Sequence, residues 1–296
     1  FDIVFATSSR LGTGFLGYII SLINGKPLYL DIRDVFSDNI KSLNFFSKKI
    51  SYPIIKSLEK IEGLIIKKAN WVNFVSPGFF NYKHLKKSKT QINVFTNGID
   101  KIFKDVKHKN KKLIQKPINL LYAGNIGFGQ GLDLILAPIA KYFKENINIL
   151  LIGDGSSINI IKDQIKSEQL TNIQLIPPVN RRSLLRYYNN ADMFLLHLND
   201  IPAFKNVLPS KIFDYGVYNK PILAGVEGVA KEFLKENLTD STLLFKPGDF
   251  KGAITRVKAY SKDPAMKMNN KVFINKFKRS KIMGLMVESI INNYKQ

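Results

Sequence analysis

Short, continuously apolar segments alternate with stretches of helical periodicity along almost the whole sequence. Strands that are covered by helices on both faces have this composition, and their alternation with helices is typical of parallel sheets. The expected strands are residues 2–6, 28–32, 71–75, 92–95, 118–123, 148–152, 173–176, 193–198, 221–224 and 242–245. The sequence therefore predicts an α/β fold with parallel sheets.

A polar, lysine-rich segment at residues 105–117 interrupts this alternation. It ends in Pro117, and a polar stretch that ends in proline is typical of a connection between structural units. The length of 296 residues also favours two domains over one. We therefore expect two α/β domains with their boundary in this segment.

The chain is strongly basic, with 45 Lys and Arg against 23 Asp and Glu and a net charge of +22. Only 7 of the 45 are Arg, whereas proteins that read nucleic acids rely on Arg for paired contacts to bases and phosphates. We therefore expect no nucleic-acid partner. The excess of Lys is either a compositional bias or an attraction to an anionic partner or surface. Residues 1–116 carry a net +13 (21 minus 8) and residues 117–296 a net +9 (24 minus 15), which places the higher density in the first part.

Several classes of protein are excluded by what the sequence lacks. It has no Cys and only three dispersed His, so disulfides, thiolate zinc sites and a histidine metal cluster are not expected. No apolar run approaches the roughly 18 residues that a membrane-spanning helix needs. The first residues, FDIVFATSS, predict a buried strand rather than a signal peptide. We therefore expect the sequence to lack the first part of its domain.

The expected helix at residues 51–69 has two interpretations. Its apolar stripe consists of Ile54, Leu58, Ile61 and Ile65. The favoured interpretation is a surface helix that begins near Ser51, packs this stripe on the sheet and exposes its lysines to water. In the alternative, the helix and the preceding Phe45 and Phe46, which lie among lysines, contact an anionic bilayer.

The strongest local signal is a glycine-rich segment, Gly124-Asn-Ile-Gly127-Phe-Gly129-Gln-Gly131, between an expected strand and an expected helix. Glycines allow the backbone to approach an anion, and a helix N-terminus offers N–H groups to it. The spacing matches neither a P-loop nor the G-x-G-x-x-G pattern. The segment is therefore either a phosphate-binding loop or a tight strand-to-helix turn.

A second signal lies around Lys211 and Asp214, in residues 204–215. Pro209 and Ser210 predict a helix start, and residues three apart share one helical face. A lysine there would suit a phosphate, and a carboxylate would accept two hydrogen bonds from sugar hydroxyls. The alternative is a surface ion pair, which contributes little.

The order of these motifs resembles retaining nucleotide-sugar glycosyltransferases of family 4. After the glycine loop come GDG at 153–155, LLRYYNNADMFLL at 184–196 and LPSKIFDYGVYNKPILAG at 208–225. In the first half, DIVFATSS, LYLDIRDVF, WVNFVSPGF and VFTNGID are similar to the later strands of that family's N-terminal domain. The resemblance covers nearly the whole chain and is greatest to bacterial O-antigen and capsule enzymes, including N-acetyl-L-fucosamine transferases.

This resemblance implies the GT-B fold, in which two Rossmann-like domains face each other across a cleft. Residues 1–112 would form an incomplete N-terminal domain on the acceptor side. Residues 113–275 would bind the nucleotide sugar, and residues 276–296 would form a helix that packs back on the N-terminal domain. The first strands of the N-terminal domain have no counterpart in the sequence.

The resemblance also implies a donor site. Its residues would be Gly127, Phe128, Gly129, Gln130, Pro178, Val179, Lys205, Pro209, Ser210, Lys211 and Asp214. The loop amides would bind the diphosphate, Pro178 and Val179 the base, and Asp214 the ribose. The first acid of the family's E-x7-E motif falls at Asn206, and its usual loop cations fall at Asn125 and Gln130. We expect Lys205 and Lys211 to compensate the diphosphate charge instead.

In the first domain, Arg33 and Asp34 follow a strand at the sheet edge where ligands bind in α/β folds. They would be catalytic together with Lys211, or they would form a buried ion pair that fixes the loop. Thr7, Ser8 and Ser9 would contact the acceptor. His197, inside an apolar segment, is expected to be a core histidine.

The implied activity is hexosyl transfer, with retention, from a nucleotide sugar to a lipid-linked or saccharide acceptor in surface polysaccharide synthesis (lipopolysaccharide O-antigen or capsule). UDP is the preferred nucleotide, a polyprenyl-diphosphate saccharide is a candidate acceptor, and neither a metal nor another cofactor is expected. The expected location is the cytoplasm, with peripheral binding to the anionic inner face of the plasma membrane. Two alternatives stay open: an inactive or incomplete GT-B fragment that only binds nucleotide, and a GT-B enzyme of another reaction type, such as an epimerase.

Overall fold

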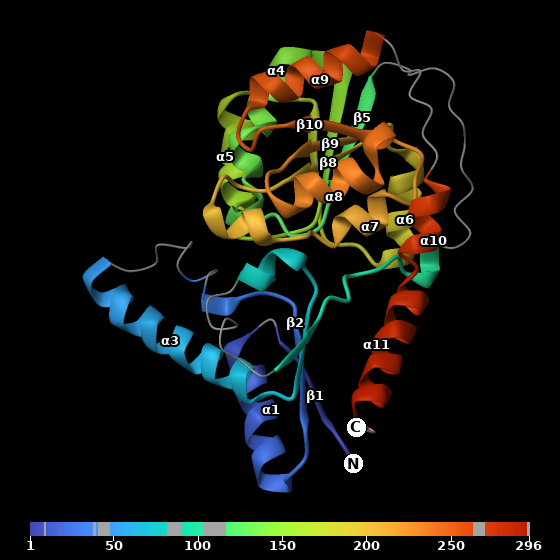
Figure 1. The fold of residues 1–296 in the computed structure, drawn as a ribbon. Coiled ribbons are helices and arrows are strands. Elements are labelled where there is room, and N and C mark those ends of the chain that lie inside the picture. The colour runs from blue at the N-terminus through green and yellow to red at the C-terminus, as the bar shows by residue number, and fades with distance from the viewer. Residues whose placement is uncertain are drawn as a thin grey trace. The chain divides into compact units, whose positions relative to one another are not determined.

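The computed structural model describes residues 1–8, 10–37, 40, 48–81, 90–103, 117–262 and 270–294. The chain forms two compact units (Figure 1). The first contains Phe1–Asn97, Ile201–Leu208 and Ile282–Gln296, and the second contains Gly98–Asp200 and Pro209–Lys281. The expected boundary at residue 112 lies outside the described residues.

The first unit contains a parallel sheet in the order β1-β2-β3-β4. Its strands are β1 (Val4–Ser8), β2 (Leu28–Ile32), β3 (Trp71–Phe74) and β4 (Gln91–Asn93). Helices α1 (Leu11–Asn24) and α3 (Lys48–Lys68) contribute Tyr18, Ile65 and Ile66 to the core on one face. On the other face, Met286 and Ile290 of α11 (Arg279–Tyr294) pack with Tyr29 and Trp71.

Helix α3 differs from the sequence-based expectation. It begins at Lys48 rather than near Ser51, and Pro53 lies inside it. Ile54 and Ile61 of the expected apolar stripe are 51% and 38% exposed. Its buried face instead includes Glu62, whose carboxylate accepts hydrogen bonds from the Phe36 N–H at 2.8 Å and the Ser37 hydroxyl at 2.6 Å. Phe45 and Phe46 lie outside the described residues.

The second unit contains a six-stranded parallel sheet in the order β10-β9-β8-β5-β6-β7. Its strands are β5 (Ile118–Ala123), β6 (Ile147–Ile152), β7 (Ile173–Ile176), β8 (Met193–His197), β9 (Ile222–Gly225) and β10 (Thr242–Phe245). Counted from β7, the strands follow the sequence order third, second, first, fourth, fifth, sixth, which is the order of dinucleotide-binding sheets. The order reverses between β5 and β8, where ligands bind at the carboxyl ends of the strands.

Helices cover both faces of this second sheet. They are α4 (Leu136–Phe143), α5 (Ile158–Ser167), α6 (Arg181–Asn190), α7 (Lys211–Tyr215), α8 (Val229–Asn237), α9 (Phe250–Lys262) and α10 (Lys271–Lys276). Ile139, Ile161 and Val257 bring α4, α5 and α9 into one apolar core. Aromatic side chains of α6, α7 and β8 pack together elsewhere in the unit, with the rings of Phe194 and Tyr215 stacked and their centres 4.6 Å apart.

The prediction of an α/β fold with parallel sheets is confirmed. No helix in the described ranges is long and apolar enough to cross a bilayer.

Candidate functional site

The glycine-rich segment leaves β5 at the point where the strand order of the second sheet reverses. Gly124 has a φ of +135°, and its N–H donates to the carbonyl of Ile152 at 2.8 Å. The loop after β6 lies directly against it: a Cβ on Gly153 would lie 1.9 Å from the Gly124 carbonyl oxygen. Glycine at 153 is therefore required for the two loops to pack together.

Most of the loop's N–H groups already have acceptors within the protein. Ile126 donates to the Asp154 carbonyl at 2.8 Å, Gly127 to the Gln130 side chain at 3.1 Å, and Phe128 to the Ser156 hydroxyl at 3.2 Å. Among the loop residues 124–129, which the structure describes, this leaves the N–H groups of Asn125 and Gly129 without a protein acceptor. The loop offers an anion fewer main-chain donors in this conformation than its glycine content suggests.

Asn199, the second residue after β8, holds the far side of this loop. Its N–H donates to the Gly129 carbonyl at 2.9 Å, and its side-chain amide donates to the Phe128 carbonyl at 3.3 Å. Asn199 is not among the residues that the sequence motifs predict for this site. The signal that could have found it is its position immediately after a strand at the reversal point of the sheet.

Lys211 is the cation that the structure places beside the loop. A Cβ on Gly124 would lie 2.7 Å from the Lys211 ammonium nitrogen, which also lies 4.9 Å from the centre of the Tyr122 ring. The side chain makes no hydrogen bond or ion pair with the residues that the structure describes. Burial lowers the pKa of Lys211 to about 8. Asn125 and Gln130 stand at the positions where family 4 enzymes usually have cations. Here the side-chain amide of Asn125 donates a hydrogen bond to the Gln130 side-chain oxygen at 3.0 Å.

Asp214 faces an arginine rather than Lys211. An Oδ1 of Asp214 lies 3.3 Å from the Arg181 guanidinium, which also lies 3.6 Å from Asp100. Burial raises the pKa of Asp214 to about 6, and the nearby Arg181 partly offsets that increase. The Lys211–Asp214 ion pair considered above is thus replaced by an Arg181–Asp214 pair, which local sequence spacing does not predict.

The remaining expected donor residues occupy different parts of the chain. Pro178 and Val179 follow β7 at the carboxyl end of the second sheet. Pro209 and Ser210 precede α7, and Ser210 is exposed. Lys205, in contrast, lies in the 3-10 turn Pro202–Asn206, which belongs to the first unit.

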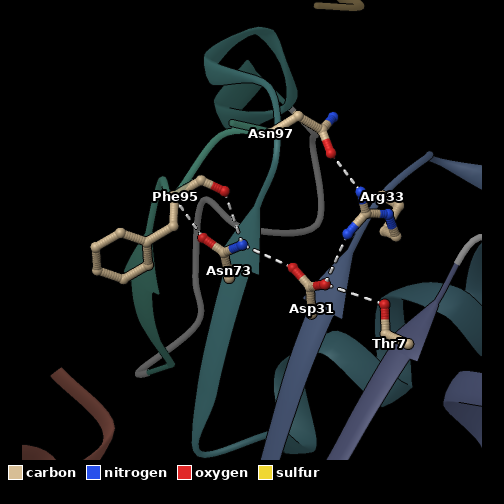
Figure 2. A network of polar contacts seen from close by, with 6 residues as sticks. All are labelled: Thr7, Asp31, Arg33, Asn73, Phe95 and Asn97. Carbon is tan, nitrogen blue, oxygen red and sulfur yellow. Dashed lines mark hydrogen bonds and ion pairs between the residues drawn. The ribbon is translucent and has the colours of Figure 1, made fainter. Parts of the chain in front are cut away.

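The first unit has a polar network at the carboxyl ends of β1, β2 and β3 (Figure 2). Its centre is Asp31, which is 6% exposed. Asp31 accepts hydrogen bonds from Asn73 at 2.7 Å and Thr7 at 3.0 Å and pairs with Arg33 at 3.4 Å. Asn73 in turn accepts from the Phe95 N–H at 2.6 Å. Through Asp31, the network holds the partly exposed side chain of Arg33 in place.

Arg33 and Asp34 do not form the ion pair considered above. Arg33 pairs with Asp31 and donates a hydrogen bond to the side chain of Asn97, while its own side chain is 43% exposed. Asp34 is half-buried, and burial raises its pKa, with Arg33 partly offsetting the increase. Thr7 is engaged by Asp31. Ser8 ends β1, and Ser9 lies outside the described residues.

His197, at the end of β8, is a structural histidine, as its apolar sequence context predicts. It is 1% exposed, its Nδ1 lies 2.6 Å from the Gln130 carbonyl, and its Nε2 accepts from the Gly248 N–H at 2.9 Å. These partners require a neutral ring with the proton on Nδ1. His197 thus connects the glycine loop to the turn after β10.

Replacing His197 by leucine should reduce the free energy of unfolding by about 2–4 kcal/mol at pH 8, because a buried apolar side chain would leave two partly buried backbone groups, the Gln130 carbonyl and the Gly248 N–H, without their partner. Burial lowers the pKa of His197 below its ordinary value of 6.5. The contribution of a neutral buried histidine to the free energy of unfolding is fully present above pH 6.5. It is lost as the pH falls through the lower pKa that the histidine has in the folded protein. Urea unfolding at pH 8 and pH 5.5 measures the free energy of unfolding of the native protein and of the His197→Leu variant. The difference between the two free energies should be smaller at pH 5.5. An equal difference at both pH values would contradict this role.

Comparison with known proteins gives one sequence family and many similar folds. HepE of Anabaena, solved in complex with UDP, has a TM-score of 0.75 at 14% identity, over 99% of this chain and 79% of HepE. Sucrose-phosphate synthase of Thermosynechococcus elongatus has a TM-score of 0.73 at 14% identity, over 99% and 74% of the two chains. A glycosyltransferase of Rickettsia africae has a TM-score of 0.64 at 16% identity, over 97% and 82%. These likenesses show the GT-B fold.

At the level of sequence, no curated protein matches the chain. The model of the family described as glycosyl transferases group 1 does match, and it aligns with residues 103–279. The matched region contains the glycine loop, Arg181, His197, Lys211 and Asp214. Since it spans more than half of the sequence, the chain belongs to the glycosyl transferases of group 1.

Proposed function

We propose that the protein is a retaining glycosyltransferase of the family 4 type that takes its sugar from a UDP-linked donor. The observation that carries the proposal is the position of Lys211, whose ammonium group lies against Gly124 at the reversal point of a dinucleotide-binding sheet. A half-buried lysine beside a glycine loop, with no ion pair to any carboxylate in the described part of the chain, suits an anionic group. HepE, whose fold is similar, is a protein solved with UDP, with UDP-glucose, and with UDP and glucose.

In the proposed donor site, the diphosphate lies between Lys211 and the loop formed by Gly127, Phe128, Gly129 and Gln130. The N–H groups of Asn125 and Gly129 are the main-chain donors left for it. The N–H of Ser210, which follows Pro209, would be a further main-chain donor to the phosphate. We leave Lys205 out of this set, because it belongs to the first unit. The ribose would meet the Asp214–Arg181 pair, and the base would lie near Pro178 and Val179.

The proposed chemistry needs charge stabilisation on the departing nucleotide. As the bond between the sugar and the diphosphate breaks, negative charge grows on the phosphate oxygen, and a fixed cation there stabilises the transition state more than the ground state. Lys211 supplies that cation, so we propose that no metal or other cofactor is required. Departure of the nucleotide and attack of the acceptor hydroxyl on the same face of the sugar would give retention, and the departing phosphate would take the proton of that hydroxyl.

On the acceptor side, we propose that Arg33 and Asp34 contact the reacting groups and that Thr7, Ser8 and Ser9 contact the acceptor. The buried Asp31–Asn73 pair would then act as a positioning group, because it holds Arg33 by a direct ion pair. The candidate acceptor is a polyprenyl-diphosphate-linked saccharide in O-antigen or capsule synthesis. The basic charge of the chain favours peripheral contact with the anionic inner face of the plasma membrane.

Transfer of radiolabelled sugar from UDP-glucose or UDP-N-acetylglucosamine to a lipid-linked saccharide tests the proposed reaction. The expected result is labelled lipid product in the presence of EDTA, with the anomeric configuration of the donor. Conversion of the donor without an acceptor would favour an epimerase instead. Donor binding with no transfer to any acceptor would favour a protein that only binds nucleotide.

Binding of UDP should depend on pH through Lys211. Because burial lowers the pKa of Lys211 to about 8, the ammonium is charged below that pH and neutral above it. The affinity for UDP should therefore fall as the pH rises above 8, by up to about tenfold per pH unit. Titration calorimetry from pH 6.5 to 9.5 measures this fall. Lys211→Arg, which keeps its charge throughout, should flatten the profile, and an unchanged profile in that variant would exclude Lys211 as its origin.

A further inference from the structure

The second unit has a pocket far from the glycine loop, with a volume of about 420 Å³. Asn119, Asn148 and Asn172 mark it at the amino ends of β5, β6 and β7, whereas the glycine loop follows the carboxyl end of β5. A strand of this length separates its two ends by roughly 15–20 Å. The pocket is therefore separate from the proposed donor site, and its volume falls in the range of roughly 300–1,000 Å³ typical of small-molecule sites.

The floor of this pocket is the face of the sheet that points away from the apolar core. Along β5, β6 and β7, the residues Ile118, Ile147 and Ile173 point into the core. The next residue of each strand points the opposite way, and these three positions hold the amides Asn119, Asn148 and Gln174. Asn119 and Asn148 are direct partners in register, and their side chains hydrogen-bond at 3.3 Å. The floor is thus a row of amides, with Leu121 and Leu150 following on the same face of β5 and β6.

Some amides of the pocket are fixed, and others are available to a ligand. Asn119 donates to Asp192 at 3.0 Å, and Asn172 donates to the carbonyls of Ala140 and Lys144 at 3.0 and 2.8 Å. These bonds hold the walls. In the described chain, the side chains of four further lining residues make no hydrogen bond: Thr171, Gln174, Tyr187 and Asn190.

The lining contains no charged side chain, although 23% of the residues in this chain are charged and its net charge is +22. A phosphate or carboxylate would find no cation here. Amides offer both donors and acceptors, which matches the alternating demands of sugar hydroxyls. The Tyr187 ring adds a flat apolar surface with a polar tip, which suits the C–H face of a pyranose.

We propose that this pocket is a second, non-catalytic binding site for a neutral saccharide. Gln174 and Asn190 bind its hydroxyl groups, and Tyr187 lies against a sugar ring. The site would hold part of a glycan chain at the end of the sheet opposite the donor. This inference concerns binding alone and does not depend on the proposed transfer reaction.

The test is a titration of the full chain with cellobiose and with N,N′-diacetylchitobiose, followed by NMR of the Asn and Gln side-chain amides. At least one of the two disaccharides should bind saturably, with a dissociation constant in the millimolar range of about 0.1–10 mM. Gln174→Ala combined with Asn190→Ala should weaken this binding about tenfold or more, because two ligand hydrogen bonds are lost. Asn189→Ala, at an exposed position of the same helix α6, is the matched control and should leave the affinity for the disaccharide unchanged.

The outcomes separate this site from the donor site. UDP should not displace the disaccharide, and the double variant should keep the native affinity for UDP. Three results would overturn the proposal: no saturable binding of either disaccharide, equal affinity in the double variant, or competition by UDP. Binding of uridine or glucuronate to the same amides in preference to the neutral disaccharides would also overturn it.

Discussion

Replacing Lys211 by alanine is expected to lower turnover about 100-fold or more, the scale of losing one group that stabilises transition-state charge. The ammonium is the nearest cation to Gly124, and the loop itself leaves only two N–H groups without a protein acceptor in the described structure. Little else in the loop could replace the lost charge. The measurement is the steady-state rate of sugar transfer at saturating donor.

A loss caused by misfolding must be separated from a loss of charge. Lys211→Met keeps the apolar stem that packs over Gly124 and Tyr122, and it should lose as much turnover as the alanine variant while retaining the native melting temperature. Lys251→Ala removes an exposed lysine of α9 and should change neither property. Native turnover in the Lys211→Met variant would remove Lys211 from the reaction.

Replacing Gly153 by alanine is expected to destabilise the second unit by about 3 kcal/mol or more and to abolish UDP binding. The new Cβ would lie 1.9 Å from the Gly124 carbonyl oxygen, and the φ of +145° is unfavourable for alanine. Because the clash is between two backbone segments, a side-chain rotation cannot relieve it. The glycine loop must therefore move. Urea unfolding and UDP calorimetry measure the two effects.

Gly284→Ala is the matched control for this clash. Gly284 lies in α11, and apart from its chain neighbours and the backbone of its own helix no atom of the described residues lies within 4 Å of the position its Cβ would take. Alanine there should leave UDP binding unchanged and should stabilise the protein by up to about 1 kcal/mol through its higher helix propensity. A Gly153→Ala protein with native stability and native UDP affinity would contradict the packing of the two loops described above.

The strands were well predicted because their signal is local. All ten expected strands are present among the described residues, and those at 28–32, 118–123, 173–176 and 242–245 have the expected bounds. A strand buried on both faces needs a continuous apolar run, and such a run is visible without knowledge of its neighbours. The amphipathic helix α3 was harder, because its buried face includes Glu62, whose partners come from the chain before it.

The charged pairs of the site could not be predicted from local spacing. Lys211 and Asp214 share a helical face, yet Asp214 pairs with Arg181, which is 33 residues away in sequence. Only the order of the strands brings the start of α6 close to α7. The same holds for Asp31, whose partner Asn73 lies on the neighbouring strand, 42 residues away.

The placement of Lys205 could not be predicted from the sequence for a different reason. Its position near Lys211 in the chain suggested a shared role, but Ile201–Leu208 pack with the first unit. The Ser76 hydroxyl donates to the Asn206 carbonyl at 2.5 Å, and a Cβ on Gly78 would lie 2.4 Å from that oxygen. A segment as short as Ile201–Leu208 has no distinctive amino-acid composition that would reveal which unit it packs with.

A crystal structure with UDP tests the central claim most directly, because the claim is that Lys211 and the glycine loop hold the diphosphate. The account predicts a phosphate oxygen about 2.7–2.9 Å from the Lys211 ammonium nitrogen, the distance of a charge-assisted hydrogen bond. It also predicts contacts to the N–H groups of Asn125 or Gly129. UDP bound elsewhere, with Lys211 still lying over Gly124 and Tyr122, would contradict it.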